Sequence, residues 1–155
     1  MKSKYLKKVI LVGMALMIAL MTMIVPASAA NNGDTDFSLN VKTSSNDYTG
    51  AREKQDDSGT YVYYKYNTTG LTGAVKFRVM GSNSQSSPAL LAINYTRNGY
   101  GTISKGQERL ISQYVYENGK KYAFLSTPKV ASGDPTGTAT GVWSPDSVGS
   151  YTYCN

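Results

Sequence analysis

Alternation of apolar and polar side chains with a period of two runs through most of the chain after residue 30, where helical spacing is hard to find. In "DFSLNVK" (36–42) and "AVKFRVM" (74–80), three large apolar side chains share one face and polar residues stand between them. Each segment predicts a half-buried β-strand. Residues 89–96, "ALLAINYT", are almost continuously apolar, which predicts a central strand covered on both faces.

Two Asn-Gly dipeptides are the most specific local signals, because this pair readily forms the type I′ turn of a two-residue hairpin. In "YVYENGKKYAF" (114–124), a turn at Asn118 and Gly119 would pair Glu117 with Lys120. That register puts one group of side chains on one face and a second group on the other. The groups are Ile111, Val115, Tyr122 and Phe124, and Tyr114, Tyr116, Ala123 and Leu125. "NYTRNGYGT" (94–102) predicts a second hairpin, with Arg97 opposite Tyr100 in cation–π range.

Toward the C-terminus the alternation loosens, and we expect one short strand near Thr138 to Trp143 with loops on either side. Trp143 is the only tryptophan, and beside Val142 it is expected to plug one end of the core, although it also remains a candidate for ligand contact. In all, about seven or eight short strands without a helix to cover them predict an all-β fold, an antiparallel β-sandwich or flattened barrel.

The first 30 residues have the pattern of a secretory signal peptide. Four lysines precede an apolar run from Val9 to Val25, and "PASAA" follows it, so we expect cleavage after Ala29 or Ala30. The alternative is an uncleaved membrane anchor, because the run approaches the length that crosses a bilayer. We therefore divide the chain into a signal peptide, residues 1–30, and a single all-β domain, residues 31–155.

Removal of the signal peptide lowers the net positive charge of the protein. Four of the 16 Lys and Arg residues lie in it, so 12 remain against 10 Asp and Glu. No basic cluster remains, which argues against a nucleic-acid partner and leaves room only for a weak, salt-sensitive preference for anionic wall polymers. We expect a secreted, extracellular protein that contacts the membrane only through its signal peptide before cleavage. A more specific form of this hypothesis is that the protein associates with the cell wall.

Cys154 is the only cysteine, so no internal disulfide can form. As the penultimate residue it is expected to be a thiol on a frayed tail, with a dimer through Cys154 as the alternative.

The absence of histidine removes the usual general base of serine and cysteine nucleophiles and most zinc and copper sites. We expect no cofactor and no enzymatic activity. Hydrolysis by a pair of carboxylates remains a distant alternative, because acidic residues are present, although most are expected in turns. Asn32, Asp34 and Asp36 have the alternate spacing of calcium ligands, but a polar leader at the new N-terminus explains them as well.

The stretch "TYVYYKYNTTG" (60–70) concentrates tyrosines on both faces of one predicted strand. One face must point outward, and exposed tyrosine rings can stack on sugar faces or on a partner protein. The competing explanation is ordinary strand packing with scattered surface rings. The candidate binding residues are Tyr61, Tyr63, Tyr64, Tyr66, Tyr114, Tyr116 and Trp143.

The segments "YVYENGKKYAFL" and "ATGVWSPDS", with the leader and the "DTDFSLNVK" start, resemble a family of small exported proteins of unknown function from Gram-positive bacteria. The resemblance implies export and a role near the envelope, and it carries over no catalytic residue. A looser resemblance is to lactococcin 972-type bacteriocins, which are also small, signal-bearing and all-β.

These observations favour a secreted, non-enzymatic protein that binds a wall polymer or an envelope protein of a Gram-positive cell. The first alternative is a bacteriocin-like or toxin-like effector, and the second is the carboxylate-dependent hydrolase.

Overall fold

The computed structural model describes residues 31–86 and 88–155. The predicted signal peptide, with its cleavage site at Ala29 or Ala30, lies outside these residues. Within them, no helix is long and apolar enough to cross a membrane.

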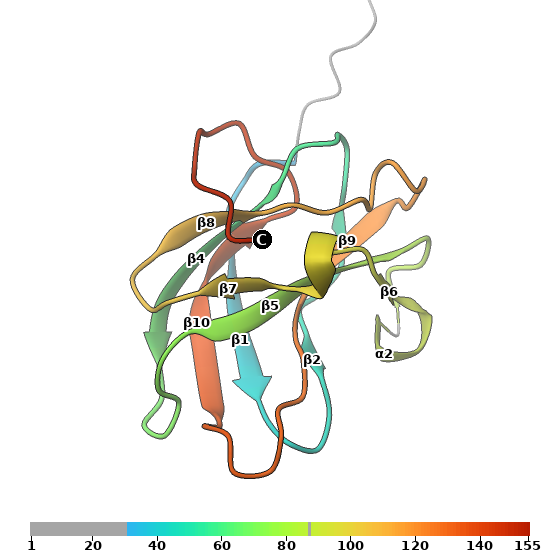
Figure 1. Ribbon diagram of the computed structural model, residues 1–155. Helices are drawn as coiled ribbons and strands as arrows, with labels where there is room; N and C mark the ends of the chain where they lie inside the picture. The colour runs from blue at the N-terminus through green and yellow to red at the C-terminus, as the bar shows by residue number, and fades with distance from the viewer. Residues whose placement is uncertain (1–30, 87) are drawn as a thin grey trace, which may run out of the picture.

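Two antiparallel sheets pack face to face, which confirms the all-β sandwich (Figure 1). The first has four strands in the order β1-β10-β4-β8. Their bounds are β1 Thr35–Val41, β10 Gly137–Ser144, β4 Thr60–Asn67 and β8 Glu108–Ile111. Each of these strands pairs antiparallel with its neighbours, and the two middle strands, β10 and β4, make the longest ladders.

The second sheet has six strands built around two long ones, β5 (Val75–Ser82) and β9 (Tyr122–Thr127). Four short strands complete it: β2 Asp47–Tyr48, β3 Arg52–Glu53, β6 Ile93–Asn94 and β7 Gly101–Ile103. Both β2 and β3 pair along β9, and both β6 and β7 pair along β5. Along one edge of the sheet β2 and β3 therefore follow each other beside β9, and along the other edge β6 and β7 follow each other beside β5.

The main core lies between the sheets and follows the predicted parity. Phe37, Leu39 and Val41 of β1 and the alternate residues of β5 point into it. Phe77 meets Phe37 edge-on, with 5.7 Å between ring centroids. A strand of period two can present only one set of side chains to the opposite sheet, so the alternation by itself selected these core residues.

The strand that is covered on both faces is β9, because all six of its residues are buried. Ala123 and Leu125 face the main core, while Tyr122 and Phe124 join Met80 in a second apolar cluster on the other side of the sheet. The segment around β2 and Ala92 covers this second cluster. The predicted face that grouped Tyr122 and Phe124 with Ile111 and Val115 is therefore wrong.

Residues 89–96 do not form the central strand that their apolar run predicted. The chain makes one helical turn, α2 (Pro88–Leu91), and then the two-residue strand β6, and the amide of Ala92 donates to the Pro88 carbonyl. An apolar run carries no period that separates a strand from a helical turn, and proline fits the first position of such a turn.

Asn118 and Gly119 do not close a two-residue hairpin. The amides of Gly119 and Lys120 donate to the carbonyls of Tyr116 and Val115, and Gly119 has φ 64°. This bonding pattern is the Schellman end of a helical turn, in which glycine takes the left-handed position. Asn-Gly supplied the left-handed residue that the sequence predicted, but the chain used it in a different turn.

The second Asn-Gly pair also fails to join two strands to each other. Asn98 and Gly99 have positive φ, 58° and 87°, within the 3₁₀ turn η1 (Arg97–Gly99). However, the strands on either side, β6 and β7, both pair with β5. Because β6 and β7 both run antiparallel to β5, the chain continues in the same direction after the turn and is not reversed by it.

The predicted strand near Thr138 to Trp143 is confirmed as β10, which is the second strand of its sheet. Trp143 is 1% exposed and belongs to the main core, as expected for a plug. A β-bulge between Thr140 and Gly141 shifts the register against β4. A Cβ added at Gly141 would collide with the Tyr63 carbonyl and the Phe37 ring.

The bulge makes Gly141 a sensitive position. We expect Gly141→Ala to reduce the free energy of unfolding by about 1–3 kcal/mol, because backbone must move to admit one methyl group. Urea denaturation monitored by Trp143 fluorescence measures this. Gly33→Ala is the matched control, since nothing lies within 4 Å of its added Cβ. Equal stability of the two variants would show that the bulge does not need glycine.

Candidate functional site

Three of the predicted contact residues are part of the interior. Tyr64 is fully buried and meets Phe77 edge-on at 5.9 Å, and Trp143 is also buried. Tyr61 lies on the outer face of its sheet but is covered by Tyr151, whose ring centroid is 4.7 Å away. Tyr64 and Trp143 have no free ring face in this fold, and Tyr61 presents only a small part of its surface, so the assignment of these three rings as contact residues is corrected.

Burial also sets the chemistry of the two enclosed phenols. Burial raises the pKa of Tyr64, and its hydroxyl makes no hydrogen bond within the described residues. Burial first, and then the neighbouring Glu108, raises the pKa of Tyr61. Both phenols therefore stay neutral near neutral pH, because burial disfavours the phenolate.

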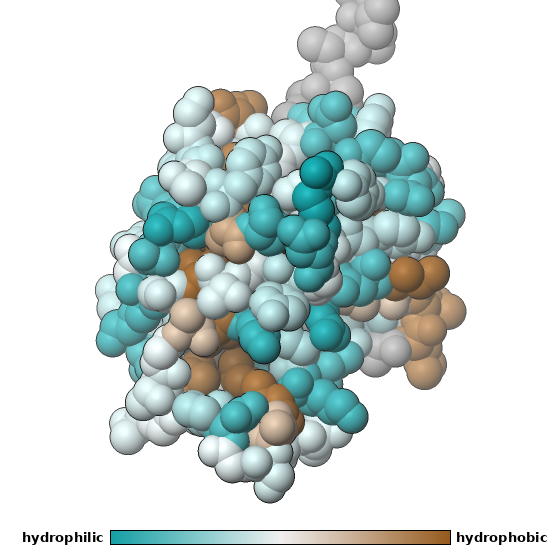
Figure 2. Space-filling view, in the orientation of Figure 1, coloured by the Kyte–Doolittle hydropathy of each residue, from teal (hydrophilic) through white to brown (hydrophobic). Residues whose placement is uncertain are grey.

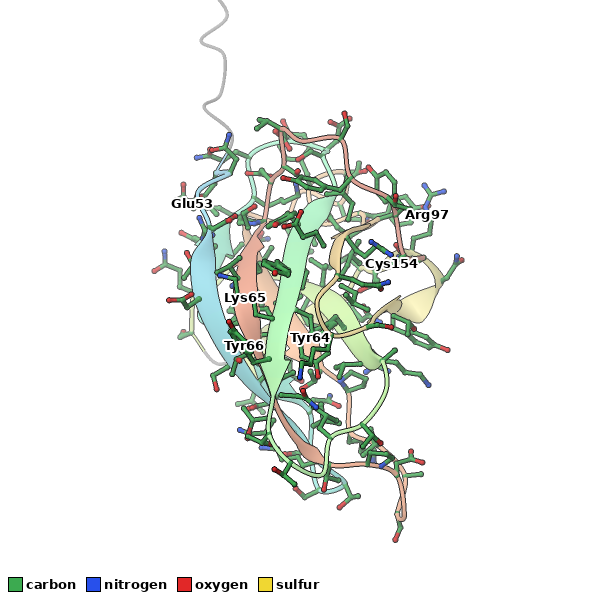
Figure 3. The ribbon with its side chains drawn as sticks, turned by 90° about the vertical axis from the view of Figure 1, so that its left-hand side faces the viewer. Glu53, Tyr64, Lys65, Tyr66, Arg97 and Cys154 are labelled. Carbon is green, nitrogen blue, oxygen red and sulfur yellow. The ribbon has the colours of Figure 1, made fainter. Side chains whose placement is uncertain are left out.

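Tyr63 and Tyr66 remain accessible on β4. Figure 3 shows Tyr66 beside Lys65 on this strand. Tyr63 is half-buried, with the Lys65 ammonium 5.4 Å from its ring centroid. Tyr66 is 68% exposed, because the register shift against β10 leaves Lys65 as an extra residue and breaks the alternation of faces after Tyr64. It lies beyond the four residues of β4 that pair with β8, so one neighbouring strand is missing beside it.

Three further exposed rings lie around η1, and the C-terminal segment carries two more, Tyr151 and Tyr153. Tyr114 and Tyr116 are exposed in the helical turn that follows β8. The Arg97 guanidinium lies over the Tyr114 ring at 4.9 Å, so the predicted cation–π contact exists but with Tyr114 in place of Tyr100. Backbone bonds from Arg97 to Ser112 and from Tyr114 to Tyr95 hold the two segments together.

Tyr100 completes this group, and sequence reasoning did not select it as a contact residue. It is 39% exposed, and the Lys76 ammonium of β5 lies 4.6 Å from its ring centroid. The signal that could have found it is the pairing of β5 with β7, which brings Lys76 opposite Thr102. We call this surface the tyrosine–cation edge: Lys76, Arg97, Tyr100, Tyr114 and Tyr116.

The chemistry of the edge is that of a contact surface. Each ring offers an apolar face and a hydroxyl group. Each cation is exposed to solvent and lies beside a ring that attracts it. Such a surface can stack on a sugar ring while it attracts a neighbouring anionic group. Neither function needs a general base or a nucleophile.

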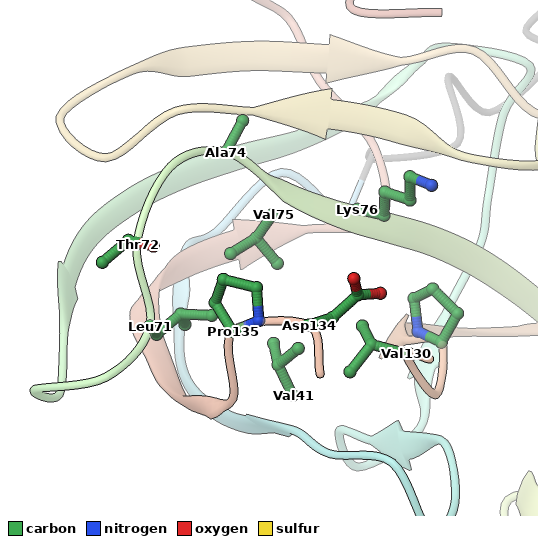
Figure 4. Close-up of a pocket in the computed structure, with 10 residues that line it drawn as sticks. Val41, Leu71, Thr72, Ala74, Val75, Lys76, Val130, Asp134 and Pro135 are labelled. Atoms are coloured by element: carbon green, nitrogen blue, oxygen red, sulfur yellow. The ribbon is translucent and has the colours of Figure 1, made fainter. Parts of the chain in front are cut away.

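A small apolar cavity opens beside β5, the strand that carries Lys76 (Figure 4). It has a volume of about 170 Å³ and is lined by Val41, Leu71, Val75, Val130 and Pro135, with Lys76 and Asp134 also at its wall. Pockets that bind drug-sized molecules usually measure about 300–1,000 Å³. This cavity therefore has room for a small apolar group only.

The weak calcium candidates do not converge in the structure. Asn32 and Asp34 line a surface pocket together with Tyr61 and Ser147, while Asp36 is paired with Val142 along β1. Within residues 31–86 and 88–155, no group of three His, Cys, Asp or Glu side chains could hold a metal ion.

A buried ion pair was not anticipated from the sequence. Lys54 follows β3 and Asp146 follows β10, and both side chains have no exposed surface. The Lys54 ammonium donates to Asp146 Oδ1 at 2.5 Å. Asp146 lies in "SPDS" (144–147), a segment with the composition of a turn, and no local pattern distinguishes it from the other turn carboxylates.

Arg52 of β3 adds further polar contacts next to this ion pair. Its guanidinium donates to the Trp143 carbonyl at 3.0 Å and to the Asn31 side chain at 2.6 Å, and it lies 5.7 Å from the Trp143 ring centroid. Burial lowers the pKa of Arg52, partly offset by Asp34 and Asp146, yet an arginine remains charged under all ordinary conditions.

The C-terminal segment is docked, so the prediction of a frayed tail is wrong. The amide of Cys154 donates to the Leu110 carbonyl, and Asn155 bonds the backbone of Arg97 and Ser112. The Cys154 side chain packs against the main core and Gly101 (Figure 3). Burial raises the pKa of its thiol to about 11.

An exposed aliphatic patch lies at α2 and β6 (Figure 2). Leu90 is 84% exposed, and Leu91 and Ile93 are more than half exposed. These are the residues that the predicted central strand would have buried.

Comparison with known proteins identifies a family without a known role. The family described as "Protein of unknown function (DUF2712)" matches residues 25–147, which is most of the chain. No curated protein and no solved structure matches the chain.

The raised pKa of Cys154 leads to a measurable difference in reactivity. At about pH 8 we expect the native thiol to react with an alkylating or disulfide reagent roughly 100-fold more slowly than the unfolded chain, because so little of it is thiolate. The rate should rise with pH up to the thiol pKa of about 11. The same protein in urea is the control, and equal rates in both states would contradict the docked tail. A non-reducing gel should accordingly show a monomer.

Proposed function

The chain belongs to DUF2712, a family of proteins of unknown function, and we propose that it is a secreted, non-enzymatic protein that binds the envelope of a Gram-positive cell. The observation that carries the proposal is the tyrosine–cation edge, where two of three exposed rings each have a cation over one face. Export rests on the leader sequence, which has the pattern of a secretory signal.

The edge matches a polymer in which sugars alternate with anionic groups. Tyr100 and Tyr114 supply apolar faces for sugar rings, and Lys76 and Arg97 supply positive charge beside them. Backbone hydrogen bonds and pairing with β5 hold the segments that carry these residues, so little conformational entropy is lost on binding. The chain has no histidine, and binding of this kind requires no catalytic group.

Co-sedimentation with purified Gram-positive cell wall tests the proposal. We expect the wild-type protein to bind, and Tyr100→Ala with Tyr114→Ala to bind roughly tenfold more weakly, because two ring contacts of about 0.5–1 kcal/mol each are lost. Tyr66→Ala is the matched control, since this ring is exposed but has no cation on its face. The melting temperatures of all three proteins should agree.

Two results would contradict this assignment. Equal loss of binding in the Tyr66 control would move the contact surface to β4, and release of soluble wall fragments would replace binding by hydrolysis. Higher salt should weaken binding if Lys76 and Arg97 contact anionic groups, because the Debye length shortens. A wall stripped of its anionic polymer should show the same weakening at low salt.

The exposed aliphatic patch favours a second candidate function, an effector released against other cells. Leu90, Leu91 and Ile93 offer apolar surface that could contact a foreign membrane or protein. Growth inhibition of neighbouring strains on a plate is the measurement. We expect Leu90→Ser to remove inhibition without loss of stability, because this side chain is already in solvent. Absence of inhibition by the wild-type protein would eliminate this candidate.

A further inference from the structure

Lys54 and Asp146 meet end to end beside Asp56, whose side chain is partly exposed. Lys54 Nζ lies 2.5 Å from Asp146 Oδ1, and both side chains are without exposed surface. Burial of a full ion pair carries a large desolvation penalty that is offset only by close geometry and further hydrogen bonds. Transfer of one proton across this short bond removes both charges and leaves an amine beside a carboxylic acid. Those two groups are the reactants of an amide.

The carboxyl group is held as an acyl-transfer site would hold it. Asp146 Oδ2, the oxygen that does not contact the lysine, accepts a hydrogen bond from the backbone nitrogen of Asn31 at 2.9 Å, which is an amide in the precursor and an α-ammonium after cleavage at Ala30. It also accepts one at 3.1 Å from the Gln55 amide, which lies 3.3 Å from Oδ1 as well. Two N–H donors aimed at one oxygen stabilise the negative charge that develops there when the carbonyl carbon is attacked.

A third carboxylate lies beside the amine. Asp56 Oδ1 is 3.4 Å from Lys54 Nζ, and Ser58 fixes this carboxylate through its amide and its hydroxyl. Burial alone would raise the pKa of Asp56, but the hydrogen bonds from Ser58 and the charge and hydrogen bond of Lys54 outweigh it and lower the pKa. Asp56 is therefore available as a base.

We propose that Lys54 and Asp146 condense to an intramolecular amide bond between Nζ and Cγ. One proton passes from the ammonium to Asp146 Oδ1, and the freed nitrogen lone pair attacks Cγ. The negative charge collects on Oδ2, where the backbone nitrogens of Asn31 and Gln55 hold it. Asp56 accepts a second proton from the nitrogen and returns it to the Oδ1 hydroxyl, and the Cγ–Oδ1 bond breaks to release water. An ammonium and a carboxylate thus yield one amide and one water, with no oxidant or other reactant.

The bond would change the connectivity of the fold. It joins the segment that follows β3 to the segment that follows β10, positions separated by 92 residues. Both sheets contribute strands to the closed loop between these residues, from β4 through β10. A chain with this link keeps the two sheets joined at this place when it is pulled or locally unfolded, because β3 belongs to one sheet and β10 to the other. The inference is independent of the envelope-binding function proposed above.

Mass spectrometry of the processed, denatured protein tests the inference. We expect a mass lower by one water than the sequence requires. Trypsin should then yield Glu53–Lys65, uncut after Lys54, joined to Val130–Asn155, because an acylated lysine is no longer a cleavage site. A wild-type protein of full mass that trypsin cleaves after Lys54 would overturn the proposal.

Three variants assign the roles. Lys54→Arg keeps a cation but is a poor nucleophile, so its mass should be the full sequence mass. Asp146→Asn should lose ammonia and give the same linked peptide as wild type, which shows that Cγ is the site of attack. Asp56→Asn should stay unlinked while its circular dichroism spectrum matches that of wild type. Water loss that persists in Lys54→Arg would overturn the proposal, and a linked Asp56→Asn would overturn the proton transfer assigned to Asp56.

Discussion

The structure depends on the contact between two sheets whose inner faces bury a continuous set of large side chains. Because side chains alternate along a strand, the inner face of each strand is filled and the outer face is released to solvent or to a covering segment. This constraint determines the status of the tyrosines on β4. Tyr64 belongs to the core, Tyr63 points outward, and Tyr61 is enclosed only because Tyr151 from the C-terminal segment lies on it.

The segments outside the two sheets contribute as much to the accessible surface as the strands. The docked C-terminus covers the β8 edge through Leu110, and it fills space beside Gly101 with the Cys154 side chain. The same segment bonds the backbone of Arg97 through Asn155. The tyrosine–cation edge is therefore supported by residues that are distant in sequence, and its rings are presented by turns whose backbones are fixed.

The buried charged cluster of Lys54, Asp56 and Asp146 differs from the tyrosine–cation edge. Lys54, Asp56 and Asp146 are brought together by the segments that follow β3 and β10, and backbone amides complete the arrangement. A charged cluster of this kind is unfavourable in a protein interior unless its groups satisfy one another. Arg52, which lies over the Trp143 ring and donates to the Trp143 carbonyl, joins polar contacts to the apolar packing of the core.

The sequence by itself determined the all-β class, the inward faces of β1 and β5, and the strand at β10, because a period of two is a local property that needs no knowledge of the partner strand. Tertiary structure decided what local pattern could not express. It placed a register shift at Lys65 that exposes Tyr66 next to buried Tyr64, and it turned the apolar run at 89–96 into a helical turn and a two-residue strand. It also placed the Asn118–Gly119 pair in a Schellman turn, since a left-handed residue suits more than one turn. Lys54 and Asp146 became neighbours only when distant segments packed together, because contacts across 92 residues leave no periodic trace in the chain.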